Sequence, residues 1–172
     1  MDPQKSKLLI LSGLFIALGI LIPSVFHAVG AGAVFLPMFW PIAVACFYLP
    51  VPMAVLIGAG TPLISFLVTG MPPVSPPVLQ IMIPELMVFS FTTSFFYRKL
   101  KSTPIISLLA GIIISRFVVA GLSWIAALIF NLPGYIFSIG AVIHSIPGSL
   151  IIIFVIPVVI RIIDSSKTIN TE

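Results

Sequence analysis

Long apolar stretches alternate with short breaks of proline, glycine and charged residues along the whole chain. A helix that crosses the hydrocarbon core of a bilayer needs about 20 consecutive, mostly apolar residues. The breaks leave room for six such stretches, so we expect an all-α fold: one integral membrane domain over residues 1–172 with six transmembrane helices. The second stretch is short and contains Pro37 and Pro41, which predicts an irregular start. The expected spans are 8–26, 34–49, 52–70, 78–97, 104–130 and 138–163.

The composition excludes a water-soluble domain. Of 172 residues, 60% are hydrophobic and only 7% are charged, whereas about a quarter of the residues of a soluble domain are charged. The N-terminal sequence MDPQKSK runs directly into the first apolar stretch with no small-residue cleavage site, which predicts a retained span rather than a signal peptide. The single cysteine, Cys46, lies in an apolar run and indicates packing rather than a disulfide framework.

The charges predict an orientation in the membrane. The three loops at 27–33, 71–77 and 131–137 carry no Lys or Arg, whereas the N-terminal segment, the break after the fourth span and the C-terminal end do. Basic residues favour the cytoplasmic side, so we expect both termini in the cytoplasm. No basic cluster with interleaved aromatic residues is present, so a nucleic acid is not an expected partner. Seven of the eight basic residues then lie inside: Lys5, Lys7, Arg98, Lys99, Lys101, Arg161 and Lys167.

Four ionisable residues within or beside the spans stand out: His27, Glu85, Arg116 and His144. A charge near the bilayer centre costs several kcal/mol, so it usually faces the bundle interior and has a partner. In the expected topology Glu85 and His144 approach from the outer side, and the long side chain of Arg116 reaches towards them. This predicts an outward-facing polar pocket. The alternatives are a structural Glu85–Arg116 ion pair, a hydrogen-bonded core histidine at 144 and a solvated loop histidine at 27.

Small residues recur at helical spacing on two of the expected spans. Gly140 and Gly148 flank His144 on one stripe, which predicts free volume beside the imidazole. In the third span small residues favour close packing of membrane helices over a pocket. These positions are Ala54, Gly58, Thr61, Ser65 and Thr69.

Several segments together resemble the substrate-binding S component of energy-coupling factor (ECF) vitamin transporters. The segments are GLFIALGILIP, FLPMFWPI, YLP, TPLISFLVTGMPP and PELMVFSFTTSFFYRKL, and they cover roughly residues 8–100. The resemblance implies a six-helix subunit of a prokaryotic cell membrane that binds a vitamin or similar micronutrient at its outer face. It also implies no ATPase activity of its own, and association with a transmembrane coupling protein and two cytoplasmic ATPases.

The resemblance assigns roles to particular residues. A small-xxx-small motif on the first span contacts the coupling protein in this family, and it corresponds here to Gly13 and Ala17, with glycine in place of the usual alanine. The family's Gly-Pro turn after the second span reads Leu49-Pro50, which is a departure from the pattern. The family's pocket lies between spans four to six. The residues of this chain that fall there are Glu85, Arg116, Asn131 and His144.

Aromatic residues suggest the class of substrate. Trp40, with Phe39 and Trp124, could stack on a ring, although such residues also anchor helices at the lipid interface. With Arg116 and His144 as cations, we expect a small carboxylated or heteroaromatic vitamin such as niacin or pantothenate.

Two other classes of function agree less well with the sequence. A stand-alone secondary carrier or channel is the alternative, but the internal repeats typical of many carriers are not evident in the sequence. An intramembrane enzyme is not expected. Ser145 adjoins His144, but neighbours on a helix point about 100° apart, and the chain contains no GxSxG or HExxH motif. No metal or cofactor is expected.

Overall fold

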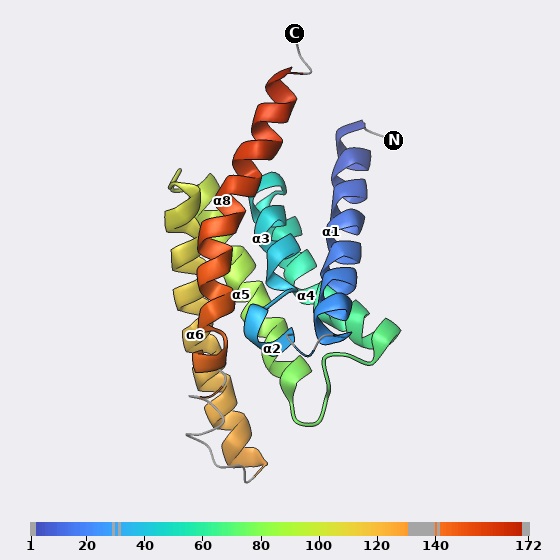
Figure 1. Cartoon of the computed structure of the whole chain (residues 1–172), viewed down its shortest axis with the longest axis vertical. Coiled ribbons are helices and arrows are strands. Elements are labelled where there is room, and N and C mark those ends of the chain that lie inside the picture. Colours follow the sequence, from blue (N-terminus) through green and yellow to red (C-terminus); the bar gives the residue numbers. More distant parts are fainter. Residues whose placement is uncertain (1–2, 29, 31, 131–139, 141, 170–172) are drawn as a thin grey trace.

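The chain folds as a bundle of helices. The computed structural model describes residues 3–28, 30, 32–130, 140 and 142–169, and this part of the chain contains no strand. Helix α1 begins and helix α8 ends at the same end of the bundle (Figure 1). The helices are α1 Pro3–Ala28, α2 Gly32–Phe35, α3 Phe39–Tyr48, α4 Val51–Thr69, α5 Val78–Arg98, α6 Pro104–Ile129 and α8 Ile146–Ile169.

The lengths of these helices confirm the expected polytopic membrane fold. Among the described residues, five segments are long and apolar enough to cross a bilayer, and Phe39–Tyr48 is a shorter apolar helix. The five are Pro3–Ala28, Val51–Thr69, Val78–Arg98, Pro104–Ile129 and Val142–Ser166. Helix α1 begins at Pro3, before the expected span. Proline is compatible with this position because the first helical turn does not need its missing N–H.

The short second crossing is divided in two, as its prolines predict. Helices α2 and α3 are separated by residues 36–38, and Leu36 has a left-handed φ of 50°. Pro37 disfavours a helical conformation for the residue before it, so α2 cannot continue into α3. Pro41 lies in the first turn of α3, where no backbone N–H is needed for the helix.

Helix α3 forms the centre of the core. Phe39, Ile42, Ala43, Ala45 and Cys46 on this helix are all fully buried, and α3 packs against α1, α4, α5 and α8. A helix that is apolar on all sides needs such an enclosed position. The other helices therefore form a wall around α3, and their outer faces are available to lipid.

Helix α5 packs closely between α4 and α6, and a glycine makes each contact possible. A Cβ on Gly58 of α4 would lie 2.6 Å from the Leu86 carbonyl oxygen and from Ser90 Oγ. A Cβ on Gly111 of α6 would collide with Thr93 Oγ1. On the other side of α4, Thr61 fills the space beside Gly19 of α1. The expected packing role of Gly58 and Thr61 is thus confirmed.

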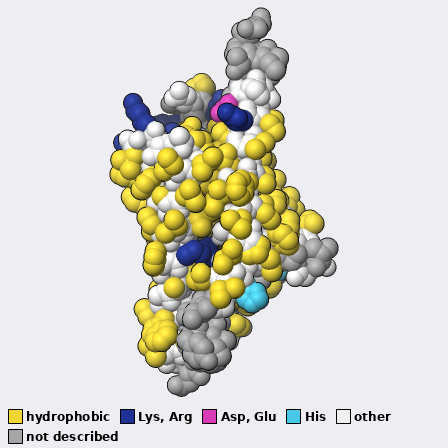
Figure 2. All heavy atoms as spheres, turned by 60° about the vertical axis from the view of Figure 1, so that its left-hand side comes forward, with side chains coloured by type: hydrophobic (Ala, Val, Ile, Leu, Met, Phe, Trp, Pro, Cys, Tyr) yellow, Lys and Arg dark blue, Asp and Glu magenta, His cyan; other side chains and the backbone are white. Residues whose placement is uncertain are grey.

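The sides of the bundle are hydrophobic, and its charge gathers at one end. Figure 2 shows hydrophobic side chains over the middle of the molecule and most of the Lys and Arg side chains at the upper end, where α1 begins and α8 ends. Exposed residues such as Leu67, Phe117 and Phe154 belong to this hydrophobic surface. We call the charged end of the bundle the basic end.

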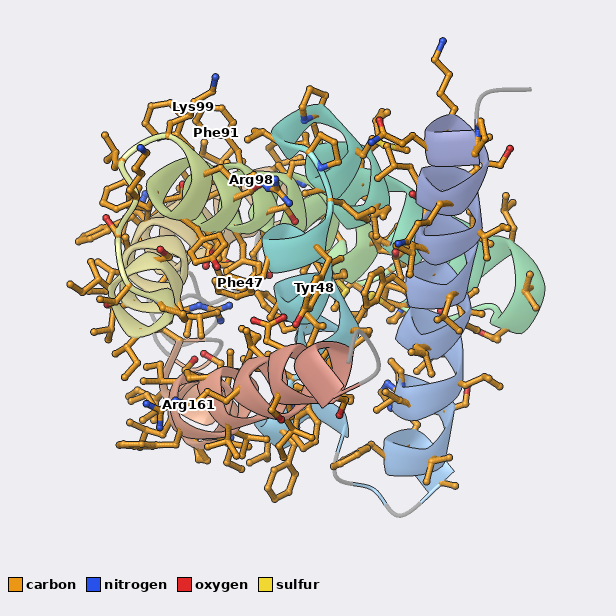
Figure 3. All side chains as sticks on the ribbon, turned by 90° about the horizontal axis from the view of Figure 1, so that it is seen from above. Phe47, Tyr48, Phe91, Arg98, Lys99 and Arg161 are labelled. Carbon is orange, nitrogen blue, oxygen red and sulfur yellow. The ribbon has the colours of Figure 1, made fainter. Side chains whose placement is uncertain are left out.

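At the basic end, the last turn of α3 is tied to two other helices. Arg98 of α5 donates a hydrogen bond from Nη2 to the Phe47 carbonyl oxygen at 3.0 Å. The Tyr48 hydroxyl lies 3.0 Å from Asp164 Oδ1 on α8, to which it donates. Figure 3, which looks down on this end, shows Phe47, Tyr48 and Arg98 near the middle of the bundle and Arg161 on its outer side.

Candidate functional site

Glu85 is carried by the first half of α5, and the loop before the helix fixes where the helix starts. The Val78 N–H donates to the Pro76 carbonyl oxygen at 2.7 Å, and the Leu79 N–H donates to the Pro73 carbonyl oxygen at 3.1 Å. Loop carbonyls thus satisfy N–H groups that no helical turn can satisfy. Glu85 follows about 10 Å along the helix at the usual rise, and it is buried on the face that points into the bundle.

Arg116 reaches Glu85 from the middle of α6, about 18 Å along that helix from its first residue. Arg116 Nη2 and Glu85 Oε1 form an ion pair, and the two side chains are only 15% and 9% exposed. The guanidinium carbon also lies 5.3 Å from the centroid of the Phe39 ring on α3, a distance at which a cation is attracted to the ring. Three helices therefore meet at this charge.

Ser145, directly before α8, supplies the second polar contact of Arg116. Arg116 Nη1 donates to Ser145 Oγ at 2.8 Å, and Ser145 Oγ lies 2.7 Å from the Val142 carbonyl oxygen. A carbonyl oxygen only accepts, so the Ser145 hydroxyl donates its hydrogen to the Val142 carbonyl. A lone pair of the same hydroxyl oxygen accepts the hydrogen bond from Arg116 Nη1. We call Phe39, Glu85, Arg116 and Ser145 the charged cluster.

The charged cluster leaves part of the donor capacity of Arg116 unused. A guanidinium has five N–H donors, and only Nη1 and Nη2 have acceptors among the described residues. Arg116 Nε is buried and has no hydrogen-bond partner in the described part of the chain. Buried donors in native proteins nearly always have a partner, so an orphan donor needs an explanation. The cluster can therefore offer an anionic group further hydrogen bonds if the group displaces a neighbour.

The other residues expected in the pocket lie elsewhere or outside the description. His144 is exposed, and no hydrogen bond or ion pair joins it to another described residue. His27 is exposed at the end of α1, and Asn131 lies outside the described residues. Trp124 is 51% exposed, so it faces the surroundings of the bundle.

Trp40 belongs to an aromatic group that joins α1, α2 and α3. Its ring lies edge-on to Phe26 with centroids 5.6 Å apart, and Phe26 lies 5.7 Å from Phe35. The indole N–H of Trp40 donates to the Phe35 carbonyl oxygen at 3.0 Å. Since an indole has only this one donor, Trp40 can offer a ligand its ring face but no hydrogen bond.

The prediction of free volume beside Gly148 is wrong. A Cβ at Gly148 would lie 2.6 Å from the Phe35 carbonyl carbon and 2.7 Å from the Val34 oxygen. The backbone of α2 fills the space beside this glycine, so Gly148 serves to dock α8 against α2. No described residue lies within 4 Å of the Cβ position at Gly140.

Gly13 and Ala17 both lie on the exposed face of α1. No described residue lies within 4 Å of the Cβ position at Gly13. No helix of the described chain covers this stripe, and it carries no polar side chain at either position.

Sequence reasoning did not assign Ser145 and Phe39 to Arg116. Phe39 was considered only as a stacking surface for a ligand ring, yet its ring lies beside the guanidinium. Ser145 was considered only as a nucleophile. Its signal is a lone hydroxyl in the apolar run before α8, at a helical position that faces inward.

The described residues contain no group of three or more His, Cys, Asp or Glu that could hold a metal ion. Comparisons of the chain with protein-family models, with curated proteins and with solved structures give no match. The grounds for a function are therefore the geometry of the charged cluster, the membrane fold and the resemblance of the sequence segments.

Proposed function

We propose that this protein is the substrate-binding subunit of an ECF-type importer of a prokaryotic cell membrane. It captures a small vitamin or related micronutrient at its outer face and delivers it through association with a transmembrane coupling protein and two cytoplasmic ATPases. The observation that carries the proposal is the charged cluster inside a multi-pass bundle. Ionisable residues in transmembrane segments are rare and mark substrate or ion pathways.

The cluster favours a ligand with a carboxylate or a similar planar anion. Arginine binds carboxylates through two parallel N–H donors, and Arg116 has donors that no described residue uses. Glu85 balances the charge of Arg116. The Phe39 ring beside the guanidinium adds an apolar surface on which an aromatic or heteroaromatic part of the ligand can pack.

The position of the cluster supports capture from the outer side. Glu85 lies about 10 Å from the start of α5 and about 20 Å from its end at Arg98, so it is nearer the end of the bundle that lacks bases. The positive-inside rule makes that end the outer one. The cluster is too far from the basic end for direct contact with an ATPase.

Mass spectrometry of small molecules that co-purify with the detergent-solubilised protein tests the proposal. We expect one small carboxylated compound with the wild type and with Ser149→Ala, because the Ser149 hydroxyl donates to the Ser145 carbonyl oxygen and not to the side chains of the charged cluster. Arg116→Gln should lose the compound, because it removes the cation and most of its donors. Absence of any co-purified compound from the wild type would contradict a high-affinity binding subunit.

An uptake assay with the identified compound separates the proposal from a stand-alone carrier. Cells that express this protein with a coupling protein and ATPases should accumulate the compound, and cells with a hydrolysis-deficient ATPase should not. Accumulation that continues without functional ATPases would overturn the proposal and indicate a secondary carrier.

A further inference from the structure

A groove lies on the surface of the bundle near the basic end, between the first turn of α6 and the second half of α8. It has a volume of about 470 Å³, within the range of about 300–1,000 Å³ that is typical of ligand sites. The charged cluster contributes no residue to it. Helices α6 and α8, whose residues line the groove, lie on the opposite side of the bundle from α1, which carries Gly13 and Ala17 (Figure 1).

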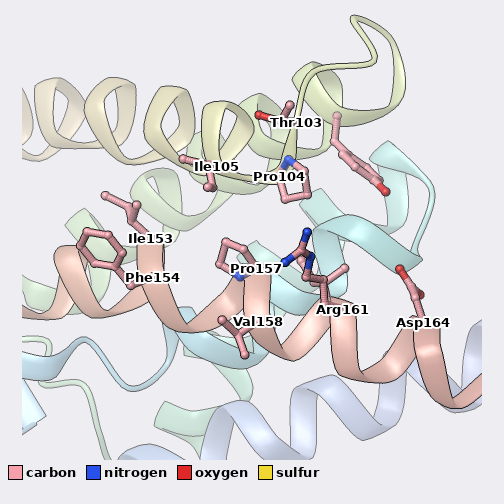
Figure 4. A pocket seen from close by; sticks show the side chains of 11 residues that line it. Thr103, Pro104, Ile105, Ile153, Phe154, Pro157, Val158, Arg161 and Asp164 are labelled. Carbon is pink, nitrogen blue, oxygen red and sulfur yellow. The ribbon is translucent and has the colours of Figure 1, made fainter.

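The lining of the groove changes from apolar to polar along its length. Ile153 and Phe154 lie at one end, whereas Arg161 and Asp164 lie at the other, and the Arg161 side chain points across towards Pro104 (Figure 4). From Ile153 to Arg161 the helix rises by about 12 Å, which approaches the thickness of one leaflet, half of the hydrocarbon core of about 30 Å. The polar end therefore lies at the level of lipid headgroups when the apolar end lies among the acyl chains.

Arg161 is a cation without a counter-ion in the described chain. Its guanidinium makes no hydrogen bond or ion pair with another described residue. Asp164, the acid one helical turn away, accepts a hydrogen bond from the Tyr48 hydroxyl instead. Helix α6 begins at Pro104 beside the groove, so the positive end of its dipole adds to the field of Arg161. Lys99 and Lys101 are exposed in the loop before α6 and make the same end more positive.

We propose that this groove binds an anionic phospholipid of the leaflet at the basic end. The phosphate lies against Arg161 and the start of α6, and one acyl chain lies along Ile153, Phe154 and Val158. Charge favours an anionic headgroup over a zwitterionic one, because Arg161, the dipole of α6 and the nearby Lys99 and Lys101 outweigh the single Asp164 carboxylate, which already accepts from Tyr48. A basic pocket between transmembrane helices is a known way to hold an anionic lipid.

Thermal unfolding of the purified full chain in an uncharged detergent tests this site. We expect phosphatidylglycerol at 100-fold over its dissociation constant to raise the unfolding temperature by about 5–10 °C. Phosphatidylcholine with the same acyl chains should have a much smaller effect. Native mass spectrometry of the same samples should retain one phosphatidylglycerol molecule per chain.

Arg161→Gln should remove the preference for phosphatidylglycerol in both measurements and leave the unfolding temperature without lipid unchanged. Lys5→Gln is the matched control, because Lys5 is also exposed at the basic end but lies on α1, outside the groove. Val158→Trp, which fills the groove without entering the core, should remove retention of the lipid.

Equal effects of the two lipids on the wild type would overturn the proposal, and so would loss of the preference in Lys5→Gln to the extent seen in Arg161→Gln. A third contrary result is an Arg161→Gln protein that keeps its lipid preference but loses binding to a coupling protein. That result would make the groove a protein interface.

Discussion

The guanidinium of Arg116 contacts residues from three parts of the chain, and the stability of the charged cluster depends on all of these contacts. Its guanidinium touches the Glu85 carboxylate, the Ser145 hydroxyl and the face of Phe39. Taking two charges out of water is costly, and their attraction offsets that cost only while both remain. Removing one charge of the pair should therefore lower the free energy of unfolding more than removing both charges.

We predict that Glu85→Gln lowers the free energy of unfolding by about 3–5 kcal/mol, because it leaves the buried Arg116 without a counter-charge. Arg116→Met combined with Glu85→Gln should recover most of the loss. Chemical unfolding of the purified proteins in detergent measures both effects. Asp164→Asn is a control that removes a carboxylate from the exposed basic end, and it should cost about 1 kcal/mol or less. A Glu85→Gln protein as stable as the wild type would show that the pair is not needed for folding.

The sequence allowed Glu85 and Arg116 to be paired in advance, because membrane charges need partners, Glu85 is the only acid within the expected spans, and Arg161 lies at the cytoplasmic end of its span. It did not allow a choice between His144 and Ser145. Neighbouring residues on a helix point about 100° apart, so the rotation of the last helix decides which of them faces inward. That rotation is set by tertiary contacts such as Gly148 against Phe35, and local sequence does not reveal such contacts.

At the scale of the helices, glycine contacts determine how closely α5 approaches its two neighbours. Gly58 and Gly111 lie against opposite sides of α5, and each faces a hydroxyl, Ser90 Oγ or Thr93 Oγ1. Both hydroxyl oxygens lack a hydrogen-bond partner in the described chain. Weak hydrogen bonds from glycine Cα–H groups recur at helix–helix contacts and suit these oxygens. The position of Glu85 beside Arg116 depends on this spacing, because α5 carries one residue and α6 the other.

We predict that Gly111→Ala lowers the free energy of unfolding by about 1–3 kcal/mol, because the new methyl group collides with Thr93 and forces α5 and α6 apart. Gly121→Ala on the same helix is the matched control, since nothing lies within 4 Å of its Cβ position. It should be neutral or stabilising by up to about 1 kcal/mol, because alanine favours a helix more than glycine does. Thermal unfolding in detergent compares the two, and equal effects would contradict a packing role for Gly111.

The helices themselves were largely predictable, and the uses of their small residues were not. Pro37 and Pro41 were enough to predict that the second crossing starts irregularly, because proline acts through local backbone geometry. A small side chain leaves space beside a helix, and the sequence does not show whether a ligand, another helix or lipid occupies that space. The sequence predicts free volume beside Gly148, but the backbone of α2 fills that space. It predicts a packing position at Gly58, and Gly58 lies against α5.

At the scale of the whole molecule, the distribution of bases predicts how the bundle sits in the membrane. Cysteines placed at Ser75 and Lys101 in a Cys46→Ser background should be labelled from opposite sides of the membrane, Ser75 from outside and Lys101 from the cytoplasm. Both positions are exposed, whereas Cys46 is fully buried, so the wild-type protein is an unreactive control. Labelling of Lys101→Cys from outside in intact cells would invert the orientation and place the charged cluster nearer the cytoplasm.

The exposed stripe on α1 connects the fold to the proposed transport function. Gly13 and Ala17 lie on its uncovered face, and a side chain at Gly13 would meet nothing within 4 Å. Bulky residues here should thus leave the bundle and the charged cluster intact. Small residues at this spacing let another helix approach closely, so we expect the coupling protein to pack against them.

We predict that Gly13→Leu with Ala17→Leu abolishes ATP-dependent uptake while ligand binding and unfolding temperature stay at wild-type values. Gly121→Leu is the matched control, because Gly121 is equally exposed and uncrowded but lies on α6, and uptake should survive it. Co-purification with a tagged coupling protein measures association directly, and only the α1 variant should lose it. Ligand binding that fails together with uptake would place this face of α1 in the binding site. Uptake that persists in the α1 variant would move the coupling surface to another helix, because close helix packing cannot accommodate two leucines in place of glycine and alanine.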